Sequence, residues 1–216
     1  MLSFLKVFLP KPKVRTLAAL QQFLEGEAAH LAQRSVIDFV RNELGSLSAQ
    51  AFDDPRFQAK LAVSRWEGFA AILADMIVLT KACLQAAGTP RATLDARLGD
   101  LYAAILAGHP APDHRAPDHR AQGWSAEIAA LRARLAAPPT GAAGPQAYAK
   151  ITGAMVFETL PFAPRDPVEN RMVLSNAFAF GLISFNDRLR RLLIVAPVTE
   201  ELVREVAGSS PVASVP

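Results

Sequence analysis

The stretch from Pro55 to Ala87 most constrains the fold, because it is long, framed by helix-end signals and apolar over most of its length. Apolar side chains recur along it at steps of three and four residues, the spacing of one buried helix side. Between Gly68 and Leu79 the only charged residue is Asp75. A helix that is apolar nearly all round must be covered on more than one side. We therefore expect this helix to lie in the middle of a helical bundle.

Residue types that favour helix ends frame this stretch. Asp54 can cap the amino end, Pro55 fits the first helical position, and Gly88 fits the position just past the carboxyl end. Similar signals predict helices over residues 16–44, 90–107, 124–137, 167–193 and 198–207. A shorter helix is expected over 145–159, although its last part, within 155–162, also fits an extended chain.

Caps and connections follow the same logic. Thr16, Thr89 and Asp166 are the expected N-caps of three of these helices. Residues 45–54 are expected to form a short loop, which would make the first two long helices antiparallel neighbours. In the later helices, the spacing places Tyr148, Ile151, Met155 and Val156 on one side, and it starts an apolar series at Met172 that continues through Phe178 and Phe185.

No alternation of period two is long enough to build a sheet. The sequence therefore predicts an all-α fold, a single-domain helical bundle of six to seven helices with three long ones. We divide the chain into a basic amphipathic arm at 1–15, an α-helical domain at 16–207 and a flexible tail at 208–216. Within the domain, 109–123 is expected to be a loop and 138–146 a linker rich in proline and glycine.

Composition limits the classes of function. The chain is 51% hydrophobic and 20% charged, so it can bury a sizeable core. The lone cysteine, Cys83, excludes an intramolecular disulfide and a cysteine-rich zinc site. Four of the basic residues lie in 1–15, without any acid, so the rest of the chain is close to neutral although the total is +3. We therefore expect no nucleic-acid partner.

The amino-terminal arm mixes apolar and basic residues, notably Phe4, Lys6, Phe8, Lys11, Lys13 and Arg15. Its apolar run is too short for a signal peptide or a transmembrane helix, so we expect neither. We favour an arm folded onto the bundle. Two alternatives stay open: a peripheral anchor on an anionic membrane surface, and a peptide that docks a partner.

Three of the four histidines, His109, His114 and His119, lie five residues apart in a loop that contains the perfect tandem repeat APDHR. Imidazoles beside carboxylates suit zinc, nickel or copper. However, the repeat is typical of a slipped duplication, and a proline-rich surface loop rarely fixes ligand geometry. We favour a solvated loop and expect no metal or other cofactor.

Single charged residues within the helices are the remaining candidates for chemistry. Glu27 and His30 form one Glu-x-x-His motif, but a di-iron site needs a second. A buried Asp75 needs a partner, and Arg188 or Arg171 on a facing helix is the expected one. We interpret Asp75 as a paired ion that fixes helix register, with a pocket carboxylate and a solvent-facing aspartate as the alternatives.

The sequence lacks a nucleophile elbow, a phosphate-binding glycine loop and a dinucleotide fingerprint. Our leading hypothesis is a non-catalytic helical interaction, adaptor or assembly protein of the cytoplasm, with a protein partner or a homodimer, and with the inner membrane face as a further contact for the arm. One alternative is a small esterase-like hydrolase using Asp75, Glu67 or His30. The other is a carrier of an apolar ligand, with a pocket lined by Trp66, Phe69, Phe178 and Phe185.

Overall fold

The computed structural model describes residues 12–109, 123–137 and 144–208, and this part of the chain is all-α. Its helices are α1 (Leu17–Leu44), η2 (Gly45–Leu47), α2 (Ser48–Asp53), α3 (Pro55–Ala86), α4 (Arg91–Ala107), α5 (Ser125–Ala136), α6 (Pro145–Phe157), α7 (Pro167–Leu192) and α8 (Val195–Gly208). The predicted all-α bundle is confirmed, with α1, α3 and α7 as its three long helices.

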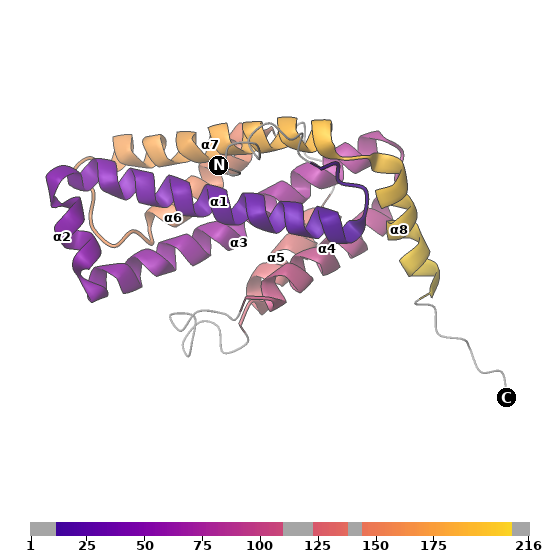
Figure 1. The fold of residues 1–216 in the computed structure, drawn as a ribbon, viewed down its shortest axis with the longest axis horizontal. Helices are drawn as coiled ribbons and strands as arrows, with labels where there is room; N and C mark the ends of the chain where they lie inside the picture. The colour runs from indigo at the N-terminus through magenta and orange to yellow at the C-terminus, as the bar shows by residue number, and fades with distance from the viewer. Residues whose placement is uncertain (1–11, 110–122, 138–143, 209–216) are drawn as a thin grey trace, which may run out of the picture.

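Helix α3 lies at the centre of the bundle, in contact with α1, α4, α5, α6 and α7 (Figure 1). Of its 32 residues, 15 are buried. Figure 1 shows α1, α3 and α7 running lengthwise, with α8 turning away at one end. The near-continuous apolar surface of α3 is therefore covered from several sides, as the sequence indicated.

By length and composition, α3 could also cross a membrane, and 56% of its most apolar window is buried inside the bundle. Central helices of soluble proteins have the same length and composition. The expected absence of a transmembrane helix therefore stays a prediction.

The predicted caps are largely confirmed. The side chains of Thr16, Asp54 and Asp166 each accept hydrogen bonds from backbone amides in the first turn of α1, α3 and α7. Gly45 and Gly88 have φ of 52° and 93°, a left-handed conformation that glycine adopts without strain.

Three sequence expectations are wrong in detail. Residues 45–54 are mostly helical, in η2 and α2, and do not form a simple loop. Thr89 does not cap α4, because Pro90 occupies the N-cap position and the Thr89 hydroxyl lies 3.0 Å from the hydroxyl of Thr199 in α8. The last helix begins at Val195, three residues earlier than expected. The segment from 145 onward is helical as far as Phe157.

The described part of the arm packs onto the bundle. Val14 is buried and pairs with the α7–α8 junction: its amide donates to Leu192 O, and its carbonyl accepts from Ile194 N, both at 2.9 Å. The ammonium of Lys13 donates to the carbonyl of Arg191 at 2.6 Å, whereas Arg15 is exposed. Phe4, Lys6, Phe8 and Lys11 lie outside the described residues, as does the tail from 209 onward.

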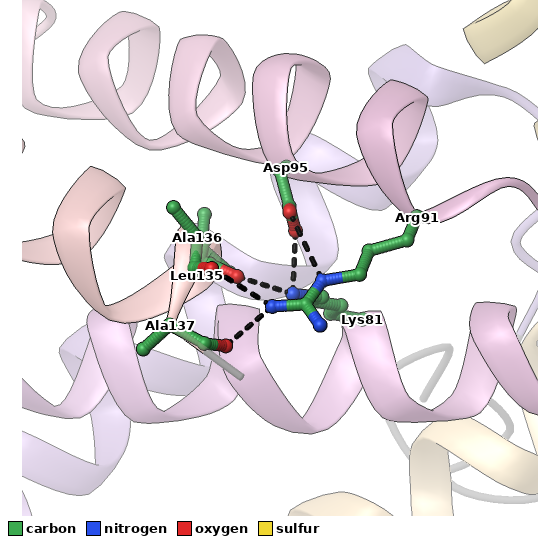
Figure 2. A network of polar contacts seen from close by, with 6 residues as sticks. All are labelled: Lys81, Arg91, Asp95, Leu135, Ala136 and Ala137. Atoms are coloured by element: carbon green, nitrogen blue, oxygen red, sulfur yellow. Dashed lines mark hydrogen bonds and ion pairs between the residues drawn. The ribbon is translucent and has the colours of Figure 1, made fainter. Parts of the chain in front are cut away.

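A buried cation fastens α5 to the rest of the bundle (Figure 2). Lys81 of α3 donates to the last-turn carbonyl of Leu135 and pairs with Asp95 of α4. Arg91 pairs with the same carboxylate at 3.4 Å and donates to the carbonyls of Ala136 and Ala137. Two cations thus satisfy carbonyls that no longer have helical partners, at the negative end of the helix dipole.

Helices α6 and α7 approach each other closely because Gly153 faces Ser175. A Cβ at Gly153 would lie 2.7 Å from the Ser175 Cα and 2.3 Å from its Oγ, distances that real Cβ atoms do not show. Since one of the two atoms belongs to the backbone, a side chain at this position would force the helices apart. The contact therefore fixes how α7 sits on α6.

We predict that Gly153→Ala destabilises the protein by about 1–3 kcal/mol through overpacking. Gly26→Ala is the matched control, because a Cβ at Gly26 in α1 meets nothing within 4 Å. This control should stabilise the protein by roughly 0.5–1 kcal/mol, since alanine loses less backbone entropy than glycine. Urea unfolding of both variants checks the pair, and equal effects of the two substitutions would contradict the close packing.

Candidate functional site

Asp75 is buried in α3, with 1% of its surface exposed, and both of its carboxylate oxygens have partners. Oδ1 lies 2.8 Å from Arg134 of α5, and Oδ2 accepts a hydrogen bond of 2.6 Å from the hydroxyl of Thr152 in α6. These three residues, which we call the Asp75 cluster, join three helices.

The prediction that Arg188 or Arg171 pairs with Asp75 is wrong. Arg188 pairs with Glu27 of α1, and Arg171 pairs with Glu158 at 2.6 Å. The partners of Asp75 are set by the helices that cover its face of α3. Helices α5 and α6 provide its partners, and both candidate arginines of α7 are engaged elsewhere.

Aromatic side chains make further contacts around the Asp75 cluster. The guanidinium carbon of Arg134 lies 4.5 Å from the ring centre of Tyr148, a cation–π contact. The hydroxyl of Tyr102 donates to the carbonyl of Ala70 at 3.0 Å, and burial raises the pKa of Tyr102 above its ordinary value. Burial also raises the pKa of Asp75, while Arg134 and Thr152 act in the opposite direction.

The residues of the alternative hydrolase site do not share one accessible surface. Asp75 lies in the interior with partners for both carboxylate oxygens, and Glu67 is also buried. His30 is on the exposed side of α1 and lines a groove between α1 and α7. The chemistry that this arrangement supports best is a structural one, in which Asp75 selects its helix neighbours.

Of the three loop histidines, only His109 lies within the described residues. Its Nε2 is 2.8 Å from Glu25 Oε1, and its ring centre lies 5.6 Å from that of Trp66 and 5.2 Å from that of Phe69. His114 and His119 fall outside the described residues. Among the residues that the structure describes, no group of three or more His, Cys, Asp or Glu side chains could hold a metal ion.

The four aromatics of the predicted carrier pocket do not line one cavity. Trp66 and Phe69 line an open cleft between α1 and α3, next to His109. Phe178 and Phe185 of α7 are fully buried, and Phe185 stacks on Phe23 of α1 at 5.7 Å between ring centres. Only the first pair is available to a ligand.

A surface that the sequence did not single out lies on the outward side of α7. Here Val168, Met172, Val173 and Phe180 are 82%, 59%, 46% and 71% exposed, with Asn176 exposed among them. We call these five residues the α7 outer face.

Two residues of α6 are also apolar and exposed, Ile151 at 73% and Met155 at 41%. The sequence had grouped them with the buried Val156, and it had placed Met172 in one series with the buried Phe178. A cavity of about 360 Å³ opens beside Val168 and Met172.

We predict a pH-dependent effect of Asp75→Asn. Because burial raises the pKa of Asp75 above its ordinary value of 3.8, the stability that this group contributes is full below 3.8 and is lost as the pH rises through the raised pKa. The asparagine variant lacks this dependence. The unfolding free energy of the wild type minus that of the variant should therefore fall with rising pH, by about 1.4 kcal/mol per unit of pKa elevation.

Urea unfolding at a series of pH values from 3.8 upward measures this difference. A difference that grows with pH would mean that the attraction of Arg134 outweighs burial, and would contradict the assigned direction.

The chain matches no protein family model, and neither the curated proteins nor the solved structures contain one that is significantly similar to it. The function must therefore be argued from the surfaces and side chains of this chain alone.

Proposed function

We propose that the protein is a non-catalytic helical interaction protein, and that its α7 outer face binds the same face of a second copy. The carrying observation is the row of large exposed apolar side chains along α7. Contiguous apolar surface of this kind marks interaction sites on soluble proteins. The charged groups of the interior support the non-catalytic part of the proposal, because they are engaged in holding helices together.

The pattern of α7 supports a second copy as the occupant. Met172 and Phe180 lie four residues before and after Asn176. If two α7 helices pack antiparallel about a two-fold axis at Asn176, Met172 of each copy lies opposite Phe180 of the other. The apolar residues then cover one another, and the two Asn176 amides can hydrogen-bond on the axis, as buried asparagines do where they fix register.

Charge adds to this complementarity. Arg165, which precedes α7, and Asp187 lie at equal sequence distances on either side of Asn176, and both are exposed. The antiparallel arrangement therefore brings an arginine of one copy toward an aspartate of the other at both ends of the contact. A parallel arrangement would instead place like charges together.

We predict that the wild type dimerises and that Met172→Ser and Phe180→Ser each weaken the dimer at least about tenfold, because each removes the burial of a large apolar side chain, worth roughly 1.5–3 kcal/mol. Leu47→Ser is the control, since Leu47 is 59% exposed on η2 and is not part of the α7 outer face. Sedimentation equilibrium measures the dissociation constants. A wild type that stays monomeric, or one that binds only a different protein, would show that a second copy is not the occupant.

The antiparallel pairing of the two α7 helices about Asn176 can be tested separately. In a Cys83→Ser background, Asn176→Cys should form a disulfide-linked dimer on mild oxidation, because the two sulfurs meet near the two-fold axis. Leu47→Cys in the same background should give far less cross-linked dimer. Equal cross-linking at both positions, read on a non-reducing gel, would contradict pairing about Asn176.

A further inference from the structure

A cleft of about 340 Å³ lies between α1 and α3, separate from the α7 outer face. Three alanines line it, Ala29 and Ala32 from α1 and Ala62 from α3. Small side chains at these positions leave the space open. Its volume lies near the lower end of the range found for small-molecule sites.

Aromatic rings form the wall of this cleft. Trp66 and Phe69 meet edge to face, with 5.9 Å between their ring centres and 84° between their planes. The His109 ring adjoins both of them and is held by Glu25, while the backbone carbonyl of His109 accepts a hydrogen bond of 2.7 Å from the indole of Trp124. The wall is thus fixed before any ligand arrives, so binding would order few side chains.

A cation stands at the edge of the same cleft. Arg65 lines it together with Gln33, and one guanidinium nitrogen of Arg65 donates to the Gln33 side chain at 3.0 Å. This contact links α3 to α1 and uses one of the five N–H groups of a guanidinium. The planar fork of an arginine suits a carboxylate or a sulfonate.

We infer that this cleft binds a small organic anion with a flat apolar body, which stacks in the aromatic wall while its anionic group meets Arg65. The combination of aromatic rings, an alanine-lined space and one exposed guanidinium fits such an amphipathic molecule better than a purely apolar ligand. The site is independent of the self-association proposed above, because it lies on α1 and α3 and uses none of the α7 outer face.

The probe is 2-naphthoate, added to the full-length wild type and followed by tryptophan fluorescence and titration calorimetry. We expect one molecule bound per chain, with binding accompanied by a change in tryptophan emission. The neutral analogue 2-naphthalenemethanol should bind at least tenfold more weakly. Arg65→Gln should remove that preference for the anion, whereas Arg34→Gln, a control at an exposed arginine of α1, should leave it unchanged.

Filling the cleft gives a second readout. Ala62→Leu should abolish naphthoate binding while the circular dichroism spectrum and the unfolding transition stay close to those of the wild type. Ala29→Leu serves as a second filling variant if the first alters the fold. Phe180→Ser should bind naphthoate normally, whether or not it dimerises. The inference is overturned if the wild type does not bind naphthoate, if both filled variants bind it as well as the wild type, or if Phe180→Ser abolishes binding.

Discussion

The arrangement of the bundle depends on one buried charge in its most apolar helix. Asp75 cannot remain unpaired in the interior, because a desolvated carboxylate without partners is costly. Its partners, Arg134 and Thr152, bring α5 and α6 against α3. Apolar packing alone is compatible with several positions of these helices. An ion pair and a hydrogen bond to the two oxygens of one carboxylate allow only a few. Once α6 is placed, the contact of Gly153 with Ser175 sets the position of α7.

The need to pair buried charges also explains which parts of the protein remain for binding. The interior carboxylates and cations near α3 are used in fastening helices, as Lys81 and Arg91 are at the end of α5. In the described part of the chain, two surface features remain beside these contacts: the apolar row of the α7 outer face and the open space of the aromatic cleft beside Arg65. Both point to binding, the first of another chain and the second of a small molecule.

The all-α class, the central place of α3 and the caps at Asp54 and Asp166 could be predicted from the sequence, because each rests on local spacing or on one residue beside a helix end. The partner of Asp75 could not, since Arg134 is distant in sequence and helix periodicity does not say which helices are neighbours. The exposure of Met172 was missed for a related reason. Helix periodicity shows which residues are apolar, but the packing of neighbouring helices decides which of them are buried. Helices α1, α3 and α6 contact α7 and leave the side with Met172 exposed.

The central claim is that the α7 outer face is where this chain meets another. Hydrogen exchange of the full-length protein at two concentrations, one below and one above the midpoint of association, tests it most directly. The account predicts that the higher concentration slows exchange of amides in α7 and the adjoining part of α6, while α3 is strongly protected at both. Slowing confined to other helices, or no change at any concentration at which the protein remains soluble, would contradict it.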